Sequence, residues 1–151
     1  MPGLSDLVRG VLRLEPQRPA MEFEGRWRTW GDLDRVVAGL DAALAAAGLG
    51  PGTRVAGLLR NHPLNAAAII GVVTSDRCIV TLNPSLPDER LAEDIRALRP
   101  PAIFGLERDW ARPVVVEAAR AIGCLGLALT DDGVRLIEGL EQLTGPDLQH
   151  E

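Results

Sequence analysis

The sequence has 151 residues, of which 46% are hydrophobic and 25% are charged, as expected for one globular domain rather than a disordered or fibrous chain. Its net charge of −5 argues against a nucleic-acid-binding protein, which needs a concentrated basic face. All 16 basic residues are Arg, and the absence of Lys excludes a Schiff base, a phosphate-loop Lys and a catalytic Lys within this chain.

The first third of the chain predicts a helix, a hairpin and a second helix. Residues 4–14 are expected to form a short helix, which is followed by two prolines that break it. Apolar and charged residues alternate over residues 21–28 around a Glu-Gly turn, a pattern typical of a small hairpin with one buried face. Thr29 and Asp32 are spaced as a capping box at the start of a strong amphipathic helix, and Gly48 stops it.

From Arg54 onward, short apolar runs of strand length alternate with helical patterns. The expected strands are 55–59, 78–82, 102–105 and 125–129, and the expected helices are 64–73, 87–98 and 113–122. Strands that alternate with helices of this length predict an α/β fold with a mainly parallel sheet flanked by helices on both faces.

We expect one compact unit with three consecutive parts. They are an N-terminal helix, hairpin and first amphipathic helix over 1–53, a strand–helix alternating core over 54–130, and a C-terminal segment with a polar tail over 131–151. Residues 134–143 contain apolar side chains without a clean period, so no regular element is predicted there. His150 is expected to be exposed in the tail.

The run from Gly48 to Gly52 contains three glycines and invites comparison with a phosphate-binding loop. Such loops follow a strand and open a helix, so that helix N–H groups point at the phosphate. This run instead follows a helix and precedes a strand, which favours a helix C-cap and a turn over a phosphate site.

Two loops fall at the carboxyl ends of predicted strands, where ligands bind to open parallel sheets. The first holds Asn61 and His62, and the second holds Asn83. For the first loop we favour a simpler interpretation, in which Asn61 caps the following helix and Pro63 lies in its first turn. Asn83 either faces a ligand or belongs to an ordinary Asn-Pro turn.

For the remaining candidate functional residues, we favour structural roles. Cys78 and Cys124 lie far apart in apolar stretches and are expected to be buried free thiols. The two histidines lack ligand spacing, so no metal site is predicted. The tryptophans are expected in the core or at a domain boundary.

Acidic residues within 87–98 should lie on a solvated helix face rather than in the dry pocket that acid–base catalysis needs. They are Asp88, Glu89, Glu93 and Asp94. No catalytic residue follows from residue types and spacing, and cofactor-binding residues stay unassigned. The longest apolar run, 66–73, is far shorter than the ~20 residues of a membrane span, and no secretion signal is visible, which favours the cytoplasm.

Five segments between about Pro19 and Phe104 follow one another in a fairly specific order. They are Thr29-Trp30-Gly31-Asp32-Leu33, the turn 48–56, the loop Asn61-His62-Pro63, the stretch 79–87 and the helix 94–100. Together they resemble the amino-terminal part of the AMP-forming acyl-CoA synthetases and adenylation domains, the adenylate-forming acid–CoA ligase superfamily.

The resemblance implies a fragment of the large N-terminal domain of these enzymes. Family members activate a carboxylic acid with ATP and Mg²⁺ and pass the acyl group to CoA or a carrier thiol. It also implies that the phosphate loop, the acid pocket, the ribose-binding Asp and the catalytic Lys domain come later than residue 151. We therefore expect no cofactor in this chain and no catalysis by it alone, although the parent protein should be a ligase.

Two positions depart from the family pattern, and the first, a charged pair where close packing is usual, implies either altered packing or drift away from activity. Asp76-Arg77 replaces a small Ala-Gly pair before the second strand, and Thr81 replaces a Pro.

The sequence leaves two functional hypotheses. The first is the scaffold of a fatty or aryl acid–CoA ligase in fatty acid metabolism, whose partner is the remainder of the ligase chain. The second is a stand-alone small-ligand-binding or dimerisation module derived from that fold, which uses the sheet edge near Asn61 and Asn83 or pairs two copies through an apolar face.

Overall fold

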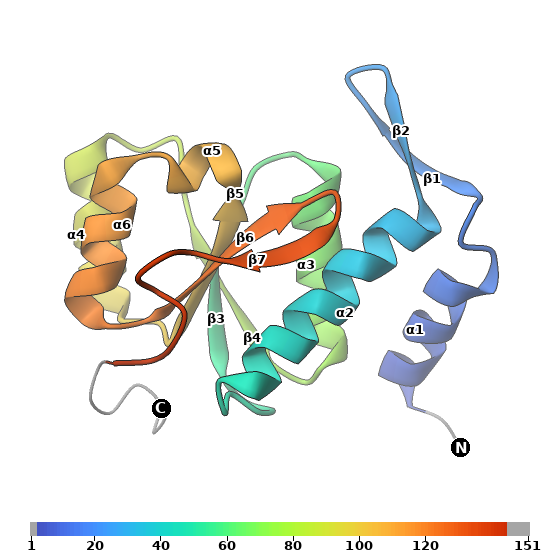
Figure 1. Ribbon diagram of the computed structural model, residues 1–151, viewed down its shortest axis with the longest axis horizontal. Coiled ribbons are helices and arrows are strands. Elements are labelled where there is room, and N and C mark those ends of the chain that lie inside the picture. Colours follow the sequence, from blue (N-terminus) through green and yellow to red (C-terminus); the bar gives the residue numbers. More distant parts are fainter. Residues whose placement is uncertain (1–2, 145–151) are drawn as a thin grey trace.

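The computed structural model describes residues 3–144 (Figure 1). In chain order the elements are α1 (Leu4–Leu14), β1 (Pro19–Phe23), β2 (Arg26–Thr29), α2 (Trp30–Ala46), β3 (Arg54–Leu58), α3 (Pro63–Thr74), β4 (Cys78–Leu82), α4 (Asp88–Leu98), β5 (Ala102–Leu106), α5 (Glu107–Trp110), α6 (Pro113–Ile122), β6 (Leu125–Thr130) and β7 (Gly133–Leu136). The predicted tail beyond residue 144, with His150, lies outside the described residues.

The start of α2 confirms the predicted capping box. The Thr29 hydroxyl accepts a hydrogen bond from the Asp32 N–H at 3.1 Å, and the Asp32 carboxylate accepts one from the Thr29 N–H at 2.8 Å. At the other end Gly48 has a φ of 80°, a left-handed conformation that ends helices. The glycine-containing run after α2 is therefore a C-cap and turn, as predicted.

The main sheet has the strand order β4-β3-β5-β6-β7. Strands β3 to β6 pair in parallel, which confirms the predicted mainly parallel sheet, and β7 pairs antiparallel with β6. The chain runs from β3 to one side at β4 and then crosses to the other side at β5. The carboxyl ends of β3 and β5 therefore form the topological switch point, where open α/β sheets bind ligands.

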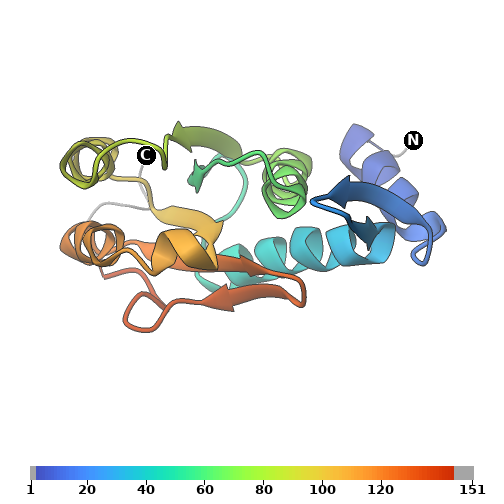
Figure 2. The ribbon, with the colours of Figure 1, turned by 90° about the horizontal axis from the view of Figure 1, so that it is seen from above.

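Helices cover both faces of this sheet, with α2 and α3 on one face and α4 and α6 on the other (Figures 1 and 2). Successive strand residues point to opposite faces. Phe104 of β5 packs in the core with α2 and α3, and its neighbour Ile103 packs in the core with α4 and α6. Burial on both faces explains why these strands are apolar throughout.

Two elements were not predicted. The helix α5 is too short for a helical period to show, and β7 is a short edge strand without a clear pattern. The apolar residues after β7 do have a role, since Ile137 and Leu140 are buried in the core with α4 and α6. Within residues 3–144, no helix has the length and apolar character needed to cross a bilayer.

The prediction for one cysteine was wrong. Cys124 is fully buried, as expected, and burial raises the pKa of its thiol to about 12. Cys78 is exposed, because β4 is the outermost strand of the sheet and Cys78 is its first residue. A run of apolar residues does not reveal whether a strand is central or at an edge.

The hairpin β1–β2 forms as predicted, but its inward face differs from the apolar pattern. Residues directly opposite each other share a face, and the register pairs Met21 with Arg28 and Glu22 with Trp27. Trp27 is consequently 59% exposed, whereas Arg28 is only 5% exposed. The hairpin thus turns an arginine, rather than a tryptophan, toward the rest of the protein.

Candidate functional site

The loop after β3 has a different cap from the one predicted. Asn61 is exposed, and the N-cap of α3 is His62, whose Nδ1 accepts a hydrogen bond from the Leu64 N–H at 3.1 Å. After β4, the exposed Asn83 accepts a hydrogen bond from the Ser85 N–H at 2.9 Å through Oδ1. Asn83 therefore belongs to a local turn, which was one of its two interpretations.

The helices that follow the parallel strands are poorly suited to nucleotide phosphates at their N-termini. Helices α3 and α6 begin with Pro63 and Pro113, which have no N–H to donate, and His62 already accepts the next N–H of α3. Helix α4 carries Asp88 and Glu89 in its first turn, where their charge repels a phosphate. The first turns of α3 and α6 thus have one N–H group fewer to donate, and the first turn of α4 is negatively charged.

An internal ion pair fills the switch point. The Arg60 Nε donates to the Asp109 Oδ2 at 2.9 Å, and its Nη2 donates to Oδ1 at 2.7 Å. Asp109, in α5, is fully buried, and the side chain of Arg60 is 25% exposed. The hydrogen bonds that Arg60 donates to Asp109 raise the pKa of Arg60. This bidentate pair ties the loop after β3 to α5 at the switch point.

A cavity of about 340 Å³ lies beside this pair, at the carboxyl ends of β5 and β6. We call it the hairpin cavity, because the hairpin β1–β2 forms one wall. It is lined by Phe23, Glu24, Arg28, His62, Leu64, Leu106, Glu107, Arg108, Leu129, Thr130 and Asp131. Of the predicted candidates, His62 lies in its wall, and Asn61 and Asn83 do not.

The wall of the hairpin cavity carries two arginines, Arg28 and Arg108, and three carboxylates, Glu24, Glu107 and Asp131. The Arg28 Nε donates to the Asp131 Oδ1 at 2.8 Å, while the Arg26 Nη1 donates to the Oδ2 of the same carboxylate at 2.9 Å. The Arg28 Nη1 is buried and has no hydrogen-bond partner among the described residues. Burial lowers the pKa of His62, as do the charges of Arg28 and Arg108, whereas the charges of Asp131 and Glu24 act in the opposite direction. The centroid of the His62 imidazole ring lies 4.8 Å from that of the Phe23 ring.

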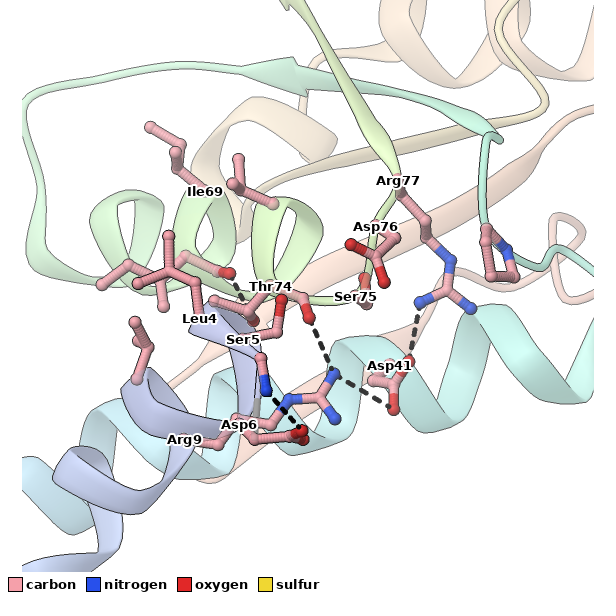
Figure 3. Close-up of a pocket in the computed structure, with 15 residues that line it drawn as sticks. Leu4, Ser5, Asp6, Arg9, Asp41, Ile69, Thr74, Ser75, Asp76 and Arg77 are labelled. Atoms are coloured by element: carbon pink, nitrogen blue, oxygen red, sulfur yellow. Dashed lines mark hydrogen bonds and ion pairs between the residues drawn. The ribbon is translucent and has the colours of Figure 1, made fainter. Parts of the chain in front are cut away.

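A larger groove of about 830 Å³ lies between α1 and the C-terminal end of α3 (Figure 3). Its walls combine apolar side chains, such as Leu4 and Val73, with a cluster of charges. The buried Arg77 pairs with Asp41 of α2 at 2.6 Å, and the Arg9 Nη2 lies 3.9 Å from the same carboxylate. This cluster ties α1 and the α3–β4 turn to α2.

The unusual Asp76-Arg77 pair belongs to this groove. Asp76 has a φ of 60°, a left-handed conformation in which Gly is favoured and Asp is tolerated. The Arg77 Nε and Nη2 donate to the Leu49 carbonyl at 3.0 and 2.6 Å. Arg77 of the charged pair therefore forms a buried tie between the α3–β4 turn and the residues that follow α2.

Sequence reasoning missed Arg28, Arg108 and Asp131 as cavity residues. The one available signal was Asp131 in a predicted turn after a strand, at the sheet edge where ligands bind. No group of three or more His, Cys, Asp or Glu side chains within residues 3–144 is arranged to hold a metal ion.

Solved structures define the class of fold. A benzoate CoA ligase from Burkholderia xenovorans LB400 is similar with a TM-score of 0.68 at 14% identity, over 87% of this chain and 26% of that one. The fold is that of part of the N-terminal domain of adenylate-forming ligases.

Sequence comparison identifies the family. The model of the AMP-binding enzyme family matches residues 9–147, and the chain belongs to this family. Over 89 residues, 59% of this chain and 7% of that protein, it is 35% identical to the AMB antimetabolite synthetase AmbB of Pseudomonas aeruginosa. Over 112 residues, 74% of this chain and 1% of that protein, it is 32% identical to Nonribosomal peptide synthetase 5 of Gibberella zeae. The chain thus spans a small part of the curated relatives it matches.

Proposed function

We propose that this chain is the N-terminal scaffold of an ATP-dependent acid–CoA ligase that activates fatty or aryl acids in the cytoplasm. The supporting observation is the family match over residues 9–147 in a chain that spans only 26% of a benzoate CoA ligase. In this proposal the remainder of the ligase supplies the groups that bind ATP, Mg²⁺ and CoA. The proline and acidic residues at the N-termini of α3, α4 and α6 support this division of roles.

The scaffold role predicts that the 151-residue chain alone is catalytically inactive. The test is ATP–pyrophosphate exchange with the purified chain and a panel of aryl, fatty and amino acids. We expect no exchange above a no-enzyme control with any acid. Exchange that depends on one acid would contradict the proposal, because it would require a complete adenylation site in this chain.

Identification of the acid substrate and of the acceptor thiol requires the full-length protein. Among the sequence relatives, the peptide synthetases favour a competing assignment, in which the acid is an amino acid and the acceptor is a carrier-protein thiol. Adenylate formation with benzoate or octanoate, followed by thioester formation on free CoA, would support the CoA-ligase assignment. Activity with amino acids alone would replace it.

A dimerisation module is the second candidate, and the outer face of α1 is the observation that favours it. Leu4, Leu7, Val11 and Leu14 are 55–77% exposed and follow the 3-4-3 spacing of a coiled-coil seam. A second copy in antiparallel orientation would set Leu4 against Leu14 and Leu7 against Val11. An added side chain at Gly10 would meet open space, so the helices can approach closely there.

Such a pairing buries little area, well below the ~1,200 Å² of stable interfaces, and should therefore be weak. Sedimentation velocity over a concentration series should show reversible dimerisation of the chain. Leu7→Glu should abolish it, whereas Leu136→Glu, at an exposed leucine of β7, should not. A monomer at every concentration would reject this candidate.

A further inference from the structure

We propose that the hairpin cavity binds a small organic anion, in which a carboxylate or phosphate group is joined to a short apolar body. This goes beyond the scaffold role, which requires no ligand in this part of the protein, and does not depend on it. The cavity lies at the carboxyl edge of a parallel sheet, on the side of the switch point that the Arg60–Asp109 pair leaves open.

The incompletely paired guanidinium of Arg28 carries the proposal. A guanidinium has five N–H donors, and a charged group that is shielded from water requires partners for them. Arg28 is 5% exposed, and its one hydrogen-bond partner among residues 3–144 is Asp131, through Nε. Asp131 also pairs with Arg26, so one carboxylate balances two guanidinium groups. A second anion next to Arg28 would complete the balance.

A second arginine in the cavity wall lacks a carboxylate partner among the described residues. Arg108 lines the cavity and has no hydrogen bond or ion pair among the described residues. Of the acidic residues, Glu107 is paired with Arg135 at 3.1 Å, and Glu24 is exposed at the tip of the hairpin.

Apolar side chains of the cavity restrict the size and polarity of the uncharged part of the ligand. Leu64, Leu106 and Leu129 line the cavity together with the ring of Phe23. The volume of about 340 Å³ is near the lower end of small-molecule sites, which span roughly 300–1,000 Å³. An aromatic ring or short chain with one anionic group fits this combination, whereas a whole nucleotide does not.

The test is titration of the isotopically labelled chain, observed by NMR, with benzoate, phenyl phosphate, inorganic phosphate, benzyl alcohol and benzylamine. We expect benzoate or phenyl phosphate to shift the amide signals of Phe23, His62 and Arg108 in a saturable manner and to raise the pKa of His62. Benzyl alcohol and benzylamine should not bind. If both organic anions fail to bind at about 10 mM, the proposal is overturned. Equal binding of inorganic phosphate and phenyl phosphate would refute the role of the apolar wall.

A matched pair of variants tests the location of the site. Arg108→Gln removes an exposed arginine of the cavity, and Arg96→Gln removes an exposed arginine of α4 outside it. Because both side chains are exposed, both variants should fold. We expect Arg108→Gln to weaken anion binding by about three- to tenfold and Arg96→Gln to leave it unchanged. Equal effects would show that the anions bind the positive surface generally, which would overturn the proposal.

Discussion

Removal of Arg60 should destabilise the fold more than removal of its partner Asp109, although both changes break the same ion pair. The two side chains differ in access to water. Asp109 is fully buried and accepts two hydrogen bonds from Arg60 that are shorter than 3.0 Å, whereas the side chain of Arg60 is 25% exposed. The carboxylate therefore depends on its partner more than the guanidinium does.

The asymmetry can be given a magnitude. Removing one member of a buried pair costs about 3–5 kcal/mol of unfolding free energy, because an uncompensated charge stays behind. Arg60→Ala strands the buried carboxylate and should cost about 4 kcal/mol. Asp109→Ala leaves a flexible, partly exposed arginine that can turn its head group to water, so about 2 kcal/mol is expected. The double variant should cost less than the sum, since neither charge is left alone.

Urea unfolding followed by far-UV circular dichroism measures these free energies, and tryptophan fluorescence adds a second probe, because one of the three tryptophans, Trp110, follows Asp109 and is buried. Arg90→Ala serves as a control, since it breaks an exposed pair with Asp94 and should cost at most about 0.5 kcal/mol. The reasoning fails if Asp109→Ala is the more damaging change, or if the two single effects simply add.

Three further outcomes follow from individual contacts. Gly57→Ala would place a Cβ 2.4 Å from the Phe104 Cζ, so it should cost about 1–3 kcal/mol and lower the melting temperature; an unchanged melting curve would contradict this packing. Cys78 should react with a thiol reagent in the native protein, whereas Cys124, whose pKa burial raises to about 12, should react only after unfolding; equal native rates would contradict the burial difference. Asp32→Ala should cost about 1 kcal/mol at neutral pH. The N-cap backbone hydrogen bond lowers the pKa of Asp32 below 3.8, so its contribution is present above that pH and is lost as the pH falls through the folded-state pKa; an equal cost at pH 2 and pH 7, measured by urea unfolding, would exclude this linkage.

Local sequence patterns were sufficient to predict much of the fold. The capping box at Thr29 and Asp32 and the turn at Asn83 depend on residues only two or three positions apart, and each is present. The parallel sheet was predictable because apolar runs of strand length alternate with helical patterns, and few architectures accommodate such an order. These features follow from covalent connectivity and burial, without knowledge of which strands are neighbours.

Errors arose where strand order or register decides the environment. Cys78 is exposed because β4 is outermost, and no local signal distinguishes an outer strand from a central one. In the hairpin, the register pairs Met21 with Arg28, so the arginine turns inward and Trp27 outward. Asp131 meets Arg28 across 103 positions of sequence, a separation at which spacing arguments have no force.

Three arginines, two of them buried and one partly exposed, join distant elements of this fold. A planar group with five donors can join distant elements, and its burial is favourable only when those donors are satisfied. Arg60 has a bidentate carboxylate in Asp109, and Arg77 has a carboxylate and a backbone carbonyl. Arg28 alone of the three has a buried Nη atom without a partner among the described residues, and it shares Asp131 with another arginine. All three arginines join elements by the same chemistry, and only the hydrogen bonding of Arg28 is incomplete within residues 3–144. Because Arg28 also lines the hairpin cavity, we infer that a ligand completes its hydrogen bonding.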